Sequence, residues 1–145
     1  MVIDNIKNEL KRLYIIIIKM KYKGDLNGEI FDLDDIFVEN SLVIKELVKV
    51  CSNGEVIILS YDDMDRELLD ISVKLMRALV DGDRKCIKFK GEFMVDSNME
   101  KIVRVLNMVN FYDIKVLEEY LVNFFVEKLR ACNNEQELRD LFNGG

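Results

Sequence analysis

Apolar residues recur along this chain at two spacings, and each spacing predicts one kind of secondary structure. Residues 3–13 place apolar residues at helical intervals between charged ones, which predicts a short amphipathic helix. Residues 14–22 are rich in β-branched residues and predict a strand. Gly24 and Asn27-Gly28 then favour a turn into a second strand, residues 29–33, because both residue types tolerate positive φ. The chain is therefore expected to begin with a helix and a β-hairpin.

The middle of the chain predicts two further helices and a third strand. Asp34-Asp35 offers a cap for a short helical turn, and Asn40-Ser41 offers a cap for a helix that continues to Val50. The apolar run 56–59 has no polar interruption, which is typical of a buried strand. Asp62-Asp63 is expected to begin the helix that follows.

The region around Gly82 separates that helix from the last third of the chain. Asp81-Gly82-Asp83 is expected to end the helix, and residues 84–92 are ambiguous, so no element is assigned to them. Asp96-Ser97 followed by Glu100 has the spacing of a capping box and predicts the start of another helix.

Two helices are predicted at the end of the chain. Asp113 is expected to cap a helix that runs to about Arg130. Asn133-Asn134 offers caps for a final helix, Glu135–Phe142, which Gly144 is expected to stop. Together with the strands, these helices predict an α/β fold in one compact unit, since 145 residues suffice for a conventional core.

The helix that begins at Asp113 carries more apolar surface than one core requires. At 100° per residue its apolar residues cover an arc of about 200°, whereas packing on one core needs little more than about 100°. These residues are Ile114, Leu117, Tyr120, Leu121, Val122, Phe124, Phe125 and Leu129. Either its own domain buries this helix on two sides, or one edge of it meets a partner protein.

The final helix also needs a surface to pack on, because so short a helix is unstable alone. It presents Leu138, Leu141 and Phe142 at positions i, i+3 and i+4. Packing on the preceding helix and packing on a partner protein both account for this pattern. In the second case the partner meets both helices.

Charge and composition exclude several classes of function. The net charge of −6 and pI near 4.8 argue against a nucleic-acid-binding surface, and Lys19, Lys21 and Lys23 are interpreted as a solvated strand face. The apolar run 13–18 is far shorter than the ~20 residues of a membrane span. The protein is therefore expected to bind neither nucleic acid nor membrane.

Residue usage also argues against catalysis. The chain has no histidine, which excludes Ser-His and Cys-His nucleophile pairs and the usual zinc-water sites. Cys51, Cys86 and Cys132 are widely spaced and form no metal-binding motif, and the aspartate clusters are interpreted as helix starts. We expect no enzyme activity, no metal and no cofactor, and a reducing compartment, cytoplasm or nucleus.

Three segments in the same order resemble the Skp-type adaptors that link cullins to F-box proteins in SCF ubiquitin ligases. Asn27–Asp34 is similar to that family's Asp-Gly-Glu-Ile-Phe-Glu-Val-Asp hairpin, and Asn110–Lys115 to its Asn-Tyr-Leu-Asp-Ile-Lys helix junction. Gln136–Asn143 resembles its Glu-Glu-Ile-Arg-Lys-Thr-Phe-Asn ending.

The resemblance implies a BTB/POZ domain, a small mixed sheet packed with helices, at residues 14–112. Residues 1–13 would precede it, and the helices of residues 113–145 would form a partner-binding platform. In this family the Asn-Tyr pair faces the cullin, which implies that role for Asn110 and Phe111. The platform holds the F-box, and the matching residues are Leu121, Phe124, Phe125, Leu129, Leu138, Leu141 and Phe142.

The chain departs from the family pattern at several positions. Phe111 lacks the tyrosine hydroxyl, Glu135 stands where the family has proline, and the connection 131–134 is one residue longer. The family continues past this point with an acidic tail that wraps the F-box, whereas the sequence ends at Gly145. The expectation is weaker F-box binding than a full-length adaptor shows, with self-association when no partner is bound.

Two alternatives belong to other classes of binding protein. An elongin C-like adaptor shares the BTB fold but ends before the last helix, so the presence of residues 136–143 favours the Skp type. A self-associating BTB scaffold would use the fold as a homodimer, and sedimentation of the pure chain separates it from an adaptor.

Overall fold

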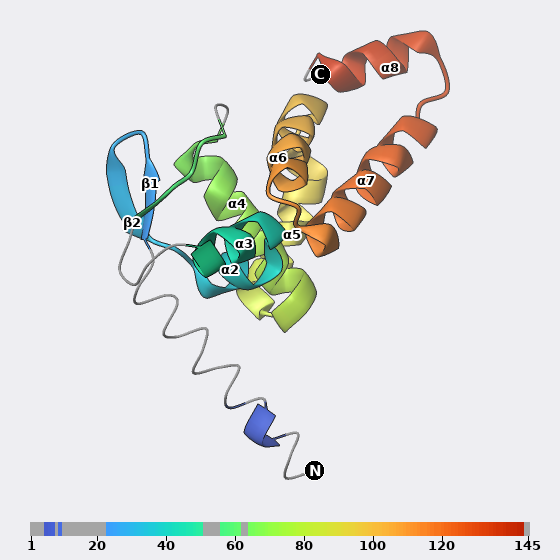
Figure 1. Cartoon of the computed structure of the whole chain (residues 1–145). Coiled ribbons are helices and arrows are strands. Elements are labelled where there is room, and N and C mark those ends of the chain that lie inside the picture. Colours follow the sequence, from blue (N-terminus) through green and yellow to red (C-terminus); the bar gives the residue numbers. More distant parts are fainter. Residues whose placement is uncertain (1–4, 8, 10–22, 51–55, 62–63, 144–145) are drawn as a thin grey trace. The chain divides into compact units, whose positions relative to one another are not determined.

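The computed structural model describes residues 5–7, 9, 23–50, 56–61 and 64–143 (Figure 1). The chain divides into two compact units, residues 1–60 and 61–145, and each is described here by itself. Residues 5–7 and 9 are helical, as predicted for this part of the helix 3–13. The predicted strand 14–22 lies outside the described residues.

The hairpin is confirmed, although its first strand lies closer to the turn than predicted. Strands β1 (Lys23–Leu26) and β2 (Glu29–Asp32) are antiparallel. Asn27 and Gly28 connect them with φ values of 55° and 84°, the positive values that this kind of tight turn requires. The backbone N–H of Gly28 donates to the Asp25 carboxylate at 3.0 Å. The prediction that Gly24 belongs to the turn is wrong: it lies within β1 opposite Phe31, where a Cβ atom would come within 2.8 Å of the Phe31 ring.

Two predicted helices connect this hairpin to a third strand. Helix α2 (Asp35–Asn40) has Asp34 as its N-cap, and in α3 (Leu42–Val50) the backbone N–H of Ile44 donates to Ser41 Oγ. Strand β3 (Val56–Ile58) then pairs with β1 in parallel, which gives the order β2-β1-β3. The predicted mixed α/β character is confirmed.

The prediction that β3 is buried on both faces is wrong. Ile57 is buried, whereas Val56 and Ile58 are 42% and 69% exposed. The pairing register explains this alternation, because Asp25 of β1 lies between Ile30 and Ile58 in one row. Side chains in such a row point to the same face of the sheet, and here that face is the exposed one.

The second unit is helical (Figure 1). Helix α4 (Arg66–Met76) continues into the π-helical turn η1 (Arg77–Asp81), and α5 (Arg84–Asp96) and α6 (Met99–Phe111) follow. Helices α7 (Lys115–Arg130) and α8 (Glu135–Phe142) complete the unit. Its most deeply buried side chains are Leu68, Leu75, Met76, Met99, Ile102, Val105, Met108, Val109, Tyr112, Ile114, Leu117 and Leu121.

Three predicted caps need correction. Helix α4 is capped by Asp65, while Asp62-Asp63 lies outside the described residues. Helix α6 is capped by Asn98, so the Asp96-Ser97 prediction is wrong; the side-chain oxygen of Asn98 accepts the Lys101 N–H at 2.8 Å. Asp113 does not cap α7, because it has φ 52° and Ile114 is the residue that precedes the helix.

The starts of two other helices either confirm a prediction or define a helix that was not predicted. Asn134 caps α8 as predicted, with its side chain accepting the Glu137 N–H at 2.8 Å. The unassigned segment 84–92 is the first part of α5, which Asp83 caps after Gly82 turns the chain at φ 65°. Gly144 lies outside the described residues.

The chain divides differently from the prediction. The sequence predicted one compact unit made of the segments 1–13, 14–112 and 113–145, whereas the structure has two units. The boundary between the observed units falls at residues 60 and 61. A boundary at residue 112 would separate α6 from α7, which pack against each other. Their connection is also closed by a hydrogen bond from the Ile114 N–H to the Val109 carbonyl at 3.1 Å.

Candidate protein-binding site

The inner face of α7 is part of the core of the 61–145 unit. Ile114, Leu117 and Leu121 are fully buried, and Phe124 is 6% exposed. Their spacing of three or four residues forms one stripe along the helix. Leu121 and Phe124 were predicted to face an F-box; the structure instead packs both into the core, which leaves a partner none of Leu121 and only 6% of Phe124 to cover.

The other apolar side chains of α7 are only partly covered. Phe125, Val126 and Leu129 are half-buried, and Val122 is 40% exposed. The wide apolar arc predicted from the sequence therefore divides into a buried stripe and a second, incompletely covered side. The Phe125 ring on this side meets the Phe142 ring edge-on, with centroids 6.4 Å apart.

Helix α8 has no buried residue at all. Leu138 and Phe142 are 38% and 44% exposed, and Leu141 is half-buried. After the turn that follows α7, α8 runs back towards α6 and packs against it (Figure 1). We call Phe125, Leu129, Leu138, Leu141 and Phe142 the α7–α8 surface.

Local polar contacts hold α8 in a helical conformation without a core of its own. Glu137 accepts the Asn133 N–H at 2.6 Å, and Arg139 pairs with Glu135 at the same distance. Gln136 donates to Asp140 at 2.8 Å. These contacts leave the apolar side chains of the helix available at its surface.

The second predicted site lies at the turn between α6 and α7. Asn110 is exposed, and Phe111 is 47% exposed. The Phe111 ring lies 5.3 Å from that of Tyr61 and 5.0 Å from that of Tyr112. Tyr112 is only 2% exposed, so of these two neighbouring aromatic residues Tyr112 is part of the core and Phe111 is partly open to solvent.

Sequence reasoning missed the two tyrosines of this aromatic cluster. Tyr112 adjoins the Asn110-Phe111 pair, and burial raises the pKa of its phenol, with the Tyr61 backbone acting in the opposite direction. Tyr61 is far from the pair in sequence, and no local pattern indicates that it contacts Phe111. We call Tyr61, Asn110 and Phe111 the turn cluster.

Tyr120 is the most perturbed phenol of the described residues. Burial, with a smaller contribution from Glu127, raises its pKa to about 12. Its hydroxyl has no hydrogen-bond partner among the described residues. The ring itself stacks on Phe124, with centroids 6.3 Å apart, and Lys90 Nζ lies 5.6 Å from the centroid of the Tyr120 ring.

Replacing Tyr120 with phenylalanine is expected to make the protein less sensitive to alkaline unfolding. A phenol whose pKa is raised by folding contributes stability below its unfolded value near 10, and this contribution is lost as the pH rises to about 12. Chemical unfolding of both proteins between these pH values measures the difference. Tyrosinate absorbance that shows every tyrosine ionising at its ordinary pH would contradict the assignment.

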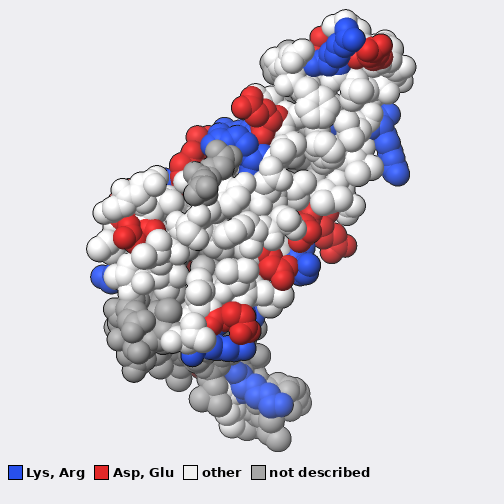
Figure 2. All heavy atoms as spheres, turned by 45° about the horizontal axis from the view of Figure 1, so that its top comes forward, with Lys and Arg blue, Asp and Glu red and all other residues white. Residues whose placement is uncertain are grey.

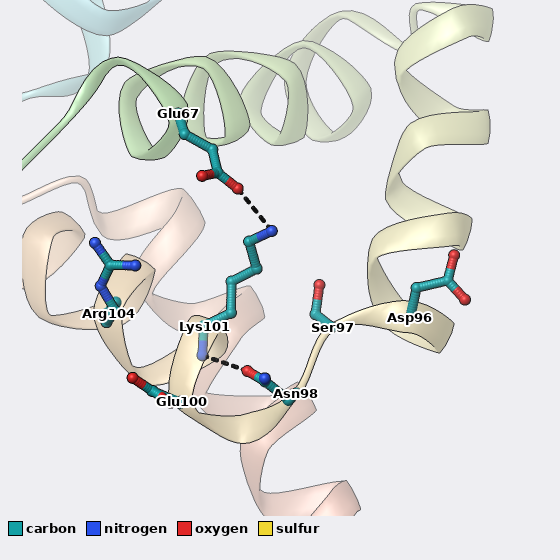
Figure 3. Close-up of a pocket in the computed structure, with 7 residues that line it drawn as sticks. All are labelled: Glu67, Asp96, Ser97, Asn98, Glu100, Lys101 and Arg104. Atoms are coloured by element: carbon teal, nitrogen blue, oxygen red, sulfur yellow. Dashed lines mark hydrogen bonds and ion pairs between the residues drawn. The ribbon is translucent and has the colours of Figure 1, made fainter. Parts of the chain in front are cut away.

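A polar hollow of about 390 Å³ lies between α4 and the start of α6 (Figure 3). Glu67 and Lys101 point towards each other across it and form an ion pair at 2.7 Å. Arg104 also lines it and pairs with Asp65 at 3.4 Å. Since these charges neutralise one another, we do not assign a ligand to this hollow.

Charged side chains form no broad field on the face shown in Figure 2. Lys and Arg lie beside Asp and Glu in small groups, separated by uncharged surface. An extended track of Lys and Arg is what a phosphate backbone requires. The face shown in Figure 2 carries no such track.

Two further features are absent from the part of the chain that the structure describes. None of its helices combines the length and the apolar character that crossing a bilayer requires. Within the same residues, no group of three His, Cys, Asp or Glu side chains is placed to bind a metal ion. Comparison with known proteins found no matching family model, curated protein or solved structure.

Proposed function

We propose that the protein is a Skp-type adaptor that links a cullin to an F-box protein in an SCF-type ubiquitin ligase. The observation that carries this proposal is α8, an amphipathic helix without a single buried residue. Its Leu138 and Phe142 are partly exposed, and the Phe142 ring contacts Phe125 on the half-covered side of α7. Such a surface favours a helical partner that covers apolar side chains.

The chemistry of the α7–α8 surface fits an F-box, which is itself a helical segment. Phe142 and Leu138 would insert into the partner, and Phe125, already in contact with Phe142, would support them from below. Rings and leucines of this kind supply much of the energy of an interface when a partner removes them from water. Leu129 and Leu141 would complete the contact.

The turn cluster supports a separate cullin-binding site. Phe111 keeps nearly half its surface exposed although it contacts two other rings. A rigid, partly exposed aromatic residue loses little conformational freedom on binding and often dominates an interface. Asn110 beside it would supply the polar contact.

We further propose a BTB/POZ fold for the chain. The mixed sheet β2-β1-β3 with its two connecting helices, and the helices that follow, support this assignment. An elongin C-like adaptor would not need α8, and α8 is present with its own cap at Asn134. As an adaptor of ubiquitin ligases the protein would work in the cytoplasm and nucleus, without cofactor or catalytic residues.

The test is titration calorimetry of the chain with an F-box domain and with the N-terminal region of a cullin. The wild type is expected to bind both partners. Failure to bind either partner, together with a stable homodimer in sedimentation, would contradict the adaptor and favour the self-associating scaffold.

The cullin site has its own prediction. Changing Asn110 and Phe111 to alanine together is expected to weaken cullin binding by about 2 kcal/mol or more. The F-box affinity and the melting temperature should stay near wild type, because the buried Tyr112 is unchanged and the two replaced residues are exposed. Loss of folding together with binding would show that Phe111 acts as structural packing.

A further inference from the structure

Helix α5 carries an unusual combination of residues on its outer face. Ile87 and Val95 are 46% and 79% exposed, and Gly91 lies midway between them. At 100° per residue these three residues, spaced by four, form one stripe along the helix. Arg84 and Lys88, both exposed, flank the first half of the stripe. We call these five residues the α5 notch.

Gly91 has no evident function within the chain. A Cβ atom built at this position would meet nothing within 4 Å, so neither crowding nor a turn requires glycine here. Glycine inside a helix is unfavourable relative to alanine. A bare helix surface does, however, let the backbone of another element approach closely.

The cations of the notch have no carboxylate partner in the part of the chain that the structure describes. Arg84 and Lys88 form no ion pair with any described residue, whereas Lys74, Lys101 and Arg139 all do. They lie near the N-terminal end of α5, where the helix dipole repels positive charge. No acidic residue in the first turn offsets them, although Asp83 caps the helix.

We propose that the α5 notch is a docking surface for an acidic amphipathic helix of a partner protein. A bulky apolar residue of that helix would lie over Gly91, between Ile87 and Val95. Its carboxylates would pair with Arg84 and Lys88, which fixes the direction in which the partner crosses α5. This surface is distinct from both the α7–α8 surface and the turn cluster.

The notch favours a protein partner over a phosphate polymer or an anionic membrane. Phosphates would pair with Arg84 and Lys88 but leave Ile87 and Val95 exposed. Glu92 and Asp96, both exposed on the second half of the helix, would repel them. An amphipathic helix with acidic residues at one end satisfies both halves of the notch.

The experiment selects binders from a library of helical peptides with randomised surfaces, using the immobilised full chain. Selected peptides are expected to combine Asp or Glu with Leu or Phe, and to shift backbone NMR signals of residues 84–95. Gly91→Leu fills the notch with a good helix former. This substitution should weaken the binding of these peptides about tenfold or more, while the melting temperature of the protein does not fall.

The contribution of charge is tested separately by changing Arg84 and Lys88 to glutamate. This change should also weaken the binding of the peptides about tenfold or more. Lys45→Glu with Lys49→Glu makes the same charge change on α3 and should leave their affinity unaltered. The proposal is overturned if selected peptides show no acidic preference or bind the Gly91→Leu protein equally well. Tighter binding of duplex DNA or of phosphatidylserine vesicles to the wild type would overturn it too.

Discussion

Replacing Leu121 with alanine is expected to destabilise the 61–145 unit by about 3 kcal/mol, the usual cost of a cavity in a close-packed core. Leu121 is fully buried on the inner stripe of α7. Phe142→Ala is expected to cost less than about 1 kcal/mol, because nearly half of that side chain is already in water.

Chemical unfolding of the two variants and the wild type measures this contrast. Leu138→Ala is the matched control, since it makes the same substitution at a leucine that is 38% exposed. Equal losses for Leu121→Ala and Leu138→Ala would mean that α8 is part of the folded core and not a surface kept for a partner.

The second large effect concerns binding. Changing Leu138 and Phe142 to alanine together is expected to weaken F-box binding about 100-fold, or ~2.7 kcal/mol. Leu138 and Phe142 keep 38% and 44% of their surface exposed, and an F-box bound to the α7–α8 surface would cover them. Cullin binding should not change, because the turn cluster lies at the opposite end of α7, before Lys115. Calorimetry with each partner measures both affinities.

Gln136→Ala with Asp140→Ala serves as the control on the same helix. This pair removes a polar contact of 2.8 Å on the other side of α8 and leaves its apolar residues in place. If the control variant loses as much F-box affinity as the Leu138 and Phe142 variant, helix stability explains the result and the apolar contacts do not.

Local patterns in the sequence predicted most of the elements correctly. Asn27-Gly28 indicated the hairpin turn and Asn134 the start of α8, because each residue acts within its own segment. The predicted caps of α4 and α6 lay a few residues too early in the sequence. Several residues that can cap a helix follow one another at both places, so the pattern alone does not show which of them does so. Asp65 and Asn98 are the residues whose side chains reach the third N–H of the helix.

The candidate site depended on information that a helical wheel does not contain. The arc of α7 showed an excess of apolar residues, but not that Leu121 and Phe124 belong to the buried stripe while Phe125 and Leu129 do not. Which side is covered depends on the packing against α6. The contact between Phe111 and Tyr61 could not be predicted from the sequence either, because distant segments of the chain supply the two rings.

The parallel pairing of β1 with β3 has a consequence for folding kinetics. Helices α2 and α3 separate the two strands in sequence, so a long loop must close before Gly24 and Ile57 pair. Helices α6 and α7 are joined by a short turn and meet with little loss of chain entropy. Pulsed hydrogen exchange during refolding should therefore protect α6 and α7 first, and the edge of β1 that later pairs with β3 would stay open to aggregation until the sheet closes.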